Sequence, residues 1–561
     1  MSSWLIIDCA SKTTAVLVQE IDGRVSLLAR GEARTTLDPE GDVTLGVLQA
    51  VAQVEEASGW VLRSTRPSSG LICPVDEDGN GVDQVLVTSS VGGGLQMMVA
   101  GLVRIMTADS AERAALGAGA NVLDVISIDD GRMPYERIQR MRELKPDMFL
   151  FGGGVDQGNV SDVLEFAQEI QQAGLSFMPI VYAGNTYART AVSEILGTDY
   201  ELHMVENMRP VLEEEVLEPT RQRIHQLYMR HVVSKGPGFA RLASWASRPI
   251  MPSTGAISRL AQTVAAQEAI DLLAVHVGSS TTDVFSVFDG RFTRTVSADL
   301  GLGYSIANVA VKAGSHNLLR WLPGNQSHHQ LMDYLRNKML SPVSEPTEQL
   351  DGLTQQAAAR EAMRLALQEH RQRATSLRGV RRQRDVSAIF NQVGSDVSIV
   401  DMLRLQLIIA SASVFAWTDD QTSVRILLDG LLPQGITTLA IDQQATSPHF
   451  GVLASVAPEI GHRAFMHHGL RYLGVAVCPV GAVDKAGTCL SLIATGVDGQ
   501  EEVREFGSEQ LAFIPLRAGE RAVLQPHVSL DIGAGRGRRQ TVLMIESSCG
   551  LIIDTRKRVR A

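Results

Sequence analysis

Two similar hairpins, about half a chain apart, constrain the fold of this sequence more than any other feature. The clearer copy spans residues 272–290, where an apolar strand leads into the turn Gly278 to Thr282 and a second strand, Val284 to Phe288, leads out. The other copy spans residues 3–23. Both copies read apolar strand, small residue and serine, Thr-Thr, apolar strand, Asp-Gly. A repeat of this kind predicts a duplicated fold.

The two turns contain residue types that suit phosphate binding. Glycine lets the backbone approach a ligand, successive amide N–H groups can meet oxygens, and serine and threonine hydroxyls donate hydrogen bonds. Asp283 follows the second turn, where a carboxylate could hold a magnesium-bound water. The alternative is an ordinary hairpin turn, because turns favour the same residues for conformational reasons. The second copy of the pattern favours the phosphate-binding interpretation.

The rest of the chain indicates an α/β protein with a different C-terminal part. Strands alternate with helices, and several strands end in glycine turns, which is typical of a layered α/β domain with ligand groups at strand ends. The triple glycine 92–94 could bind an anion or allow tight packing between layers. Beyond about residue 466, short strands follow one another with turn residues between them. This pattern predicts a separate small β domain.

Composition and charge limit the partners. The chain has 561 residues, of which 45% are apolar and 20% charged, as in an ordinary globular protein. Its net charge of −11 argues against nucleic acid as the main partner. The N-terminus enters a strand without a signal core and no run reaches 18 apolar residues, so we expect a cytoplasmic protein that does not contact membranes. The five cysteines show no metal-binding spacing.

An arginine-rich stretch follows a predicted alanine-rich helix, Gln355 to His370. Six arginines lie within residues 371–384. They could dock an acidic partner or an anionic ligand, or they could form a solvated helical face and loop.

Many short segments occur along the chain in a characteristic order. They are SSVGGGLQMMVAGLV, AERAALGAGA, PDMFLFGGGVDQGN, PIVYAGN, ENMRPVL, PIMPSTGAI, VGSSTTDVFSV and TVSADLGLGYS. In sequence and order these segments resemble the glutamate mutase L (MutL) family. The similarity covers residues 1 to about 460, and the C-terminal β domain resembles the extension of longer family members.

The resemblance implies a duplicated actin-like (ribonuclease H-like) ATPase core of α/β class, with a cleft between two lobes, and a small C-terminal all-β domain. On this basis we expect a first lobe over residues 1–205 and a helical connecting segment over 206–268. The second lobe is expected over 269–465, and the β domain over 466–561.

The resemblance also implies a site for ATP with magnesium. Asp8 and Asp283 are then the catalytic residues, and each would hold magnesium through a bound water. The nucleotide contacts fall on the first hairpin tip, on the second tip, and on an adenosine-side turn at Ala410 to Ser413. The residues concerned are Ser11, Lys12, Thr13, Thr14, His276, Gly278, Ser279, Ser280, Thr281, Thr282, Ala410 and Ser411.

The sequence departs from the family pattern in all three nucleotide segments. The first motif lacks a glycine and its terminal lysine, and His276 stands where the second motif has an aspartate. A neutral imidazole is a poor substitute for a hard oxygen ligand of magnesium. The adenosine-side turn has lost three glycines, and each added Cβ obstructs close approach. These departures predict a weakened or absent ATPase.

Two functions follow from the resemblance. The first is an accessory, chaperone-type protein that uses ATP to reactivate or assemble an adenosylcobalamin-dependent mutase. The second is a pseudo-ATPase scaffold or assembly subunit that no longer hydrolyses ATP. A small-molecule kinase is a third reading, but it needs a base and a substrate pocket that the sequence does not locate. The expected partner is a mutase subunit or another protein, and self-association is a further option.

Overall fold

The computed structural model describes residues 2–36, 42–64, 70–90, 95–175, 177–231, 236–324, 326–342, 344–375, 398–482, 487–496 and 500–556. The chain divides into two compact units. Unit 1 contains residues 1–263, 376–397 and 447–468, and unit 2 contains residues 264–375, 398–446 and 469–561.

The first sheet of unit 1 has the strand order β10-β4-β1-β2-β3. Strands β1, β2 and β3 form an antiparallel meander, β4 runs parallel to β1, and the short β10 runs parallel to β4. The strands are β1 (Ser2–Cys9), β2 (Lys12–Ile21), β3 (Arg24–Arg34), β4 (Gln84–Ser89) and β10 (Met251–Pro252).

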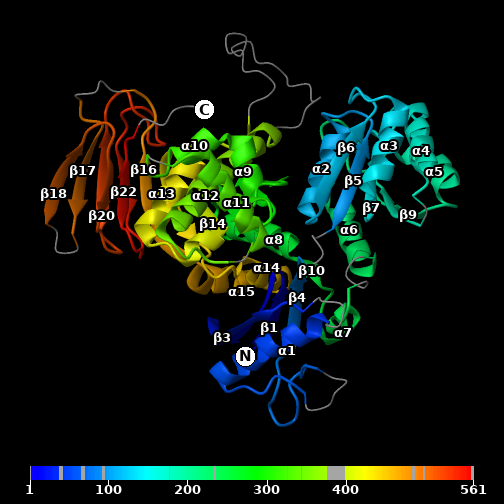
Figure 1. The fold of residues 1–561 in the computed structure, drawn as a ribbon, viewed down its shortest axis with the longest axis horizontal. Helices are drawn as coiled ribbons and strands as arrows, with labels where there is room; N and C mark the ends of the chain where they lie inside the picture. The colour runs from blue at the N-terminus through cyan, green and yellow to red at the C-terminus, as the bar shows by residue number, and fades with distance from the viewer. Residues whose placement is uncertain are drawn as a thin grey trace. The chain divides into compact units, whose positions relative to one another are not determined.

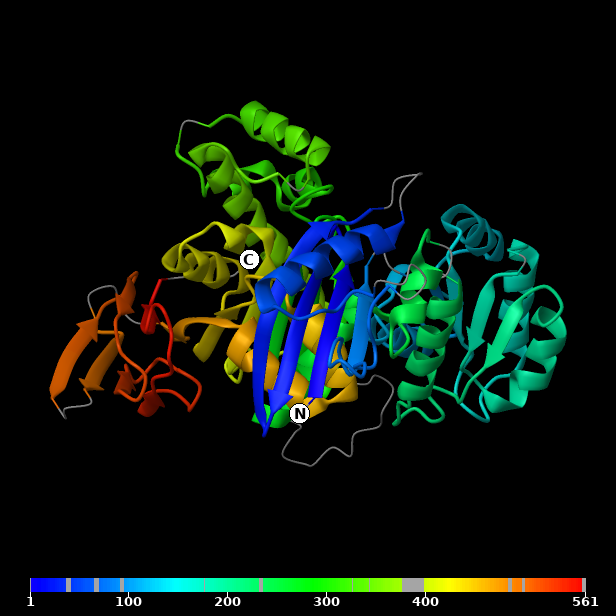
Figure 2. The ribbon, with the colours of Figure 1, turned by 90° about the horizontal axis from the view of Figure 1, so that it is seen from below.

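Helices cover both faces of this sheet. Helix α1 (Val43–Ser58) lies across the strands in Figure 2, and its buried residues share a core with Leu5 and Leu17. It begins where the Asp42 carboxylate accepts from the Thr44 N–H and ends at Gly59 in the left-handed conformation. Near the other face lie α14 (Ser447–Val456), α15 (Pro458–Ala464) and the π-helical turn η6 (Phe465–Gly469).

Unit 1 also contains a doubly wound α/β domain, drawn in cyan in Figure 1. Its five strands are all parallel, in the order β6-β5-β7-β8-β9. They are β5 (Gln96–Gly101), β6 (Asn121–Ser127), β7 (Met148–Gly152), β8 (Pro179–Tyr182) and β9 (Glu201–Met204). The connecting helices are α2 (Thr107–Gly117), α3 (Pro134–Leu144), α4 (Ser161–Ala173), η2 (Thr186–Ala188) and α5 (Arg189–Leu196). Three further helices follow, α6 (Glu218–His231), α7 (Phe239–Trp245) and α8 (Ser253–Glu268).

The large sheet of unit 2 repeats the arrangement of the first sheet. Its first five strands have the order β13-β12-β11-β14-β15, with an antiparallel meander followed by two parallel strands. They are β11 (Leu272–Val277), β12 (Thr282–Phe288), β13 (Arg291–Ser297), β14 (Leu407–Ala412) and β15 (Gly435–Ile441). Because strand order and direction agree in both sheets, the predicted duplication is confirmed, and with it the actin-like α/β fold class.

Helices of unit 2 pack on one face of this sheet around a core that includes Leu273 and Val284. The longest, α12, contains the predicted alanine-rich helix and extends it at both ends. These helices are α9 (Ile306–Ala313), α10 (Ser315–Leu319), α11 (His328–Leu340), α12 (Gln349–Arg373), η5 (Ser413–Ala416) and α13 (Asp420–Leu431).

The C-terminal strands are divided between two sheets. Three of them, β16 (Arg471–Cys478), β22 (Leu551–Asp554) and β19 (Leu511–Ile514), extend the large sheet beyond β15. The others form an antiparallel sheet of β17 (Leu490–Thr495), β18 (Glu501–Phe506), β20 (Arg521–Pro526) and β21 (Gln540–Leu543). A small β domain of short strands was predicted here; all of the described elements after residue 470 are strands, but three of them belong to the large sheet. Strand β18 is not evident from the sequence, because five of its six residues are exposed and little apolar alternation marks it.

Candidate functional site

The first hairpin places Asp8 in a cross-strand row of polar residues. Asp8 lies beside Thr14 on β2 and beside Thr88 on β4. Its Oδ1 atom accepts hydrogen bonds from the hydroxyls of Thr88 (2.7 Å) and Ser253 (2.6 Å). No described residue donates to Oδ2 of this buried carboxylate. Asp8 is therefore fixed by two neutral donors and keeps one oxygen for another ligand.

The neighbouring residues of the first tip have separate partners. The Thr14 hydroxyl lies 2.9 Å from Nε2 of the buried His449, and the Thr13 hydroxyl lies 2.8 Å from that of Thr35. Thr13 is completely buried, so it does not present its side chain to a ligand at the surface. Ser11 is exposed at the turn.

Lys12 forms an exposed ion pair with Glu32 on the adjacent strand (2.5 Å). The hydrogen bond from Lys12 is the largest influence on the Glu32 carboxyl, and it holds the pKa of Glu32 below its ordinary value. In this structure the lysine ammonium therefore lies beside Glu32 on β3.

The second hairpin has a longer tip than the first. Val277 pairs with Thr282, leaving four residues in the turn, whereas Cys9 pairs with Thr13. The Gly278 N–H donates to the Thr281 carbonyl (2.9 Å). Among the described residues, none accepts from the backbone N–H groups of Ser279, Ser280 and Thr281. Three successive free amides beside serine and threonine hydroxyls are an arrangement that can bind an anion.

A glycine-rich loop holds this tip from behind. The Leu302 N–H donates to the Gly278 carbonyl (2.9 Å), and the Gly303 N–H donates to the Ser279 carbonyl (3.0 Å). The Ser305 hydroxyl donates to the Ser280 carbonyl (2.6 Å). A Cβ at Gly301 would lie 2.4 Å from the Ser279 carbonyl, so only glycine permits this approach. The carbonyls of the tip are therefore occupied, while the N–H groups of Ser279, Ser280 and Thr281 have no acceptor among the described residues.

Asp283, the second predicted catalytic residue, is engaged in a buried ion pair. Its Oδ1 atom accepts from Nε (3.0 Å) and Nη2 (2.5 Å) of Arg294 on β13, and both side chains are almost inaccessible to solvent. The arginine also lies over the ring of Phe285. A carboxylate that compensates a buried guanidinium is a poor ligand for hydrated magnesium, because freeing it would take an anionic partner away from the buried cation.

His276 and Ser411 complete a second cross-strand row. His276 lies beside Asp283 on β12 and beside Ser411 on β14. The prediction of a turn at Ala410 to Ser413 was wrong. The first three of these residues continue β14, and Ala410 is fully buried in the core of unit 2. Small side chains such as these are compatible with a closely packed strand as well as with a turn.

The two rows are equivalent in the duplicated fold but differ in chemistry. In unit 1 the carboxylate is on the first strand of the meander (Asp8) and a hydroxyl on the second (Thr14). In unit 2 an imidazole (His276) is on the first strand and the carboxylate (Asp283) on the second. Both rows end in a hydroxyl on the adjacent parallel strand. The Oδ2 atom of Asp283 accepts from the Thr281 hydroxyl (3.4 Å), whereas Oδ2 of Asp8 has no donor among the described residues. Asp8 therefore fits a hydrated magnesium ion better than Asp283.

Four residues that lie in these rows or contact them were not predicted from the sequence: Thr88, Ser253, Arg294 and His449. Each carries a weak signal. Arg294 lies in the middle of a strand between two threonines, Thr88 follows the apolar residues of its strand, and Ser253 begins a helix. His449 lies in a helix whose residues are mostly buried.

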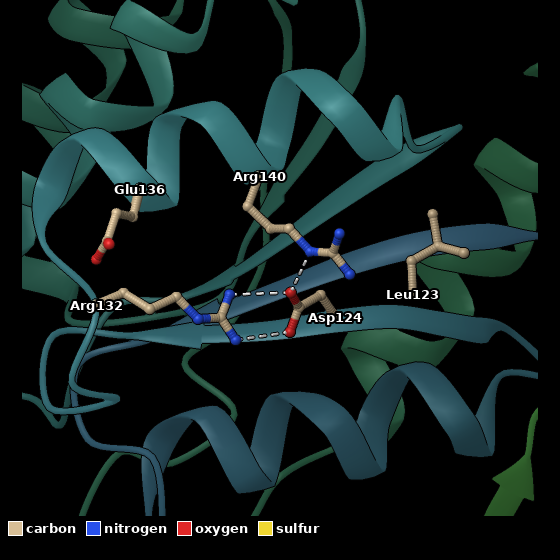
Figure 3. Close-up of a pocket in the computed structure, with 5 residues that line it drawn as sticks. All are labelled: Leu123, Asp124, Arg132, Glu136 and Arg140. Carbon is tan, nitrogen blue, oxygen red and sulfur yellow. Dashed lines mark hydrogen bonds and ion pairs between the residues drawn. The ribbon is translucent and has the colours of Figure 1, made fainter.

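A separate open pocket of about 510 Å³ lies between β6 and α3 and contains none of the predicted site residues. Figure 3 shows Arg132 and Arg140 converging on Asp124. Burial opposes ionisation of Asp124, but the hydrogen bonds from the two arginines outweigh it and lower the pKa of that carboxyl. Strand β6 lies at the edge of its sheet. Charged side chains on an edge strand prevent it from pairing with strands of other molecules, and this role explains the ion pairs of Asp124.

The described residues contain no group of three histidine, cysteine, aspartate or glutamate side chains placed to hold a metal ion. No helix in the described ranges is both long and apolar enough to cross a bilayer. The predicted triple glycine 92–94 and the arginines at 378, 381, 382 and 384 lie outside the described residues.

Comparison with known families decides the relationship. The family model described as MutL protein matches residues 4–468. The chain belongs to the MutL protein family. The Protein MutL of Clostridium tetanomorphum is 29% identical to it over 420 residues, which cover 71% of this chain and 84% of that relative.

Solved structures show weaker similarity. Nucleotide-free acetone carboxylase is 11% identical with a TM-score of 0.35, over 91% of this chain and 81% of that one. Component A of the Acidaminococcus fermentans (R)-2-hydroxyglutaryl-CoA dehydratase is 9% identical with a TM-score of 0.27, over 82% and 99% of the two chains. Similarity at this level carries no conclusion about function.

Proposed function

We propose that this member of the MutL protein family is an accessory protein that binds a nucleoside triphosphate and uses it to reactivate or assemble an adenosylcobalamin-dependent mutase. Family membership supports the accessory role, because the glutamate mutase L family is associated with such mutases. The observation that carries the nucleotide proposal is the turn of the second hairpin. It offers three amides without acceptors among the described residues and the hydroxyls of Ser279 and Ser280 at one place, while the Thr281 hydroxyl donates to Oδ2 of Asp283 (3.4 Å).

In this proposal the turn binds phosphate oxygens. The loop 300–305 keeps the turn in position, because it donates hydrogen bonds to three carbonyls of the turn. Preformed donors of this kind stabilise a phosphate without reorganisation when it binds. The exposed Ser280 is the tip residue at which a substitution disturbs the protein core least.

Asp8 is the residue that would hold magnesium through bound water, since its Oδ2 atom has no donor among the described residues. Bound magnesium would neutralise phosphate charge, and it needs only one or two carboxylates when it keeps most of its waters. Thr88 and Ser253 orient the carboxylate through Oδ1. Asp283 serves as the counter-ion of Arg294 and takes no part in this chemistry.

The pseudo-ATPase scaffold is the second candidate, and one specific observation favours it. The equivalent row of unit 2 contains His276 where the family has an aspartate, and its one carboxylate is already paired with Arg294. With a single available carboxylate, hydrolysis would be slow or absent, although phosphate could still bind.

The test that separates the two candidates uses Asp8→Asn, which keeps an oxygen for the Thr88 and Ser253 hydroxyls but removes the charge. A mutase inactivated with damaged cobalamin is incubated with ATP, magnesium and the wild-type or variant protein, and recovered mutase activity and released phosphate are measured. The reactivating role predicts ATP-dependent recovery that Asp8→Asn abolishes. Equal recovery by wild type and variant, or recovery without ATP, contradicts it and supports a scaffold.

A further inference from the structure

The doubly wound domain of unit 1 exposes large apolar side chains at one edge of its sheet. All five strands are parallel, so the loops that follow them lie at the same edge. Six exposed residues occur in these loops or at the helix starts that follow. They are Ile105, Ile128, Met133, Tyr135, Tyr187 and Val211, with exposed fractions of 37–65%.

This concentration is unusual for a surface without a partner. Single exposed apolar residues are ordinary, but a cluster on one face marks an interaction site. Tyrosine and methionine are also enriched at the centres of protein interfaces. Phe177 provides a contrast in the same domain, because it is 85% exposed but precedes β8 and so lies at the opposite edge.

The loops of this edge are held in fixed positions. The Asp156 carboxylate, after β7, accepts from the N–H and hydroxyl of Thr186, after β8, and from the side chain of Asn207, after β9. The Asp156 N–H donates to the Pro210 carbonyl (2.9 Å). A preformed face of this kind loses little conformational entropy when a partner binds.

The residues at the centre of the edge are closely packed against one another. A Cβ on Gly184 would lie 2.1 Å from the Gly153 nitrogen, and a Cβ on Gly153 would lie 2.7 Å from the ring of Tyr182. Backbone therefore fills the position at the strand ends where doubly wound folds usually bind ligands. A larger and flatter partner fits this edge better.

Charge selects the kind of partner. The loop segments 102–106, 128–136, 153–160, 183–189 and 205–215 contain eight acidic residues and four arginines. An acidic surround repels nucleic acid and anionic membranes, and it repels a second copy of the same face. The complement is a protein surface with an apolar centre and a basic rim.

We propose that the carboxyl edge of the doubly wound domain, marked by Tyr135 and Tyr187, is the docking face for a partner protein that presents an apolar patch bordered by lysine or arginine. This inference rests on the proposed function, because the partner would be the protein that this chain reactivates or assembles. It does not depend on nucleotide binding.

Site-specific photo-crosslinking in the native host tests the proposal. A benzoylphenylalanine replaces Tyr135 or Tyr187 in the full chain, and Phe177 in the control, because all three positions are exposed and aromatic. The expected result is one protein crosslinked from both tyrosine positions and not from position 177. The identified protein is then purified, and its affinity for Tyr187→Asp is expected to fall at least tenfold, while Phe177→Asp stays within about twofold of wild type.

Several outcomes would overturn the docking face. They are equal crosslinking from position 177, no crosslinks from Tyr135 and Tyr187, crosslinks to copies of this chain alone, or unchanged affinity in Tyr187→Asp. Titration of the same variants with ATP and magnesium keeps the two proposals separate. If the wild-type protein does not bind the nucleotide, the nucleotide proposal is refuted, but the crosslinking result is unaffected.

Discussion

Replacing Arg294 with methionine should strongly destabilise the large sheet of unit 2. The Arg294 and Asp283 side chains are 0% and 3% exposed, and one carboxylate oxygen accepts from two guanidinium nitrogens. Removing the arginine leaves a buried carboxylate without its counter-ion, and breaking such a pair costs about 3–5 kcal/mol. Asp283→Leu should also destabilise the sheet, because it removes an anionic partner from a guanidinium that is 0% exposed. The double variant Asp283→Leu with Arg294→Met should cost much less than the sum, since no charge stays buried.

Amide hydrogen exchange of peptides from β12 and β13 is the appropriate assay, because a protein of two units need not unfold in one step. A loss of about 3 kcal/mol corresponds to exchange faster by roughly 150-fold, at 1.4 kcal/mol for each factor of ten. The peptides of β1 and β2 serve as an internal control and should exchange as in wild type. Exchange within about tenfold of wild type in Arg294→Met, or additive effects in the double variant, would refute the reasoning.

Three further predictions follow from named contacts. His370 is fully buried between the hydroxyls of Thr295 and Ser286, and burial lowers its pKa to about 3 from an ordinary 6.5. Because His370 binds a proton more tightly in the unfolded state, the contribution of neutral His370 to folding stability is intact above pH 6.5 and is lost as the pH falls. About 2 kcal/mol of stability should be lost by pH 5. Hydrogen exchange in β12 and β13 should show this pH dependence in wild type but not in His370→Gln. Gly301→Ala should weaken phosphate binding at the turn, because its Cβ would meet the Ser279 carbonyl at 2.4 Å; Gly324→Ala, where a Cβ meets nothing, is the matched control, and equal effects would contradict the loop's role. Lys12→Ala should change stability by less than about 1 kcal/mol in thermal unfolding, since its pair with Glu32 is largely solvated, and a larger loss would indicate another role for Lys12.

The fold was largely predictable, because local sequence patterns identify its repeat. Apolar strands, short turns and the Asp-Gly ends of both hairpins appear in the sequence, and the structure turns each pattern into the same meander. The difference in tip length between the two hairpins was not predictable, because one residue more or less leaves the apolar pattern unchanged.

The partners of the predicted site residues could not be found from spacing. Ser253 reaches Asp8 across 245 residues, and Thr88 reaches it because β4 pairs with β1. Arg294 is closer in sequence to Asp283, but two strands in register decide the contact. The error at Ala410 to Ser413 has a physical reason as well. Alanine and serine are small enough for a turn, and they are equally suited to a strand packed between two neighbours.

Calorimetric titration of the protein with ATP and magnesium tests the central claim most directly. Wild type is compared with Ser280→Asp, which places a negative charge at the turn, and with Thr281→Arg, which obstructs it. Ser26→Asp, at an exposed position on β3, is the control for added charge. The account predicts saturable binding by wild type and Ser26→Asp, and at least tenfold weaker binding by both turn variants. No binding by wild type at millimolar nucleotide, or equal affinity in all four proteins, would contradict it.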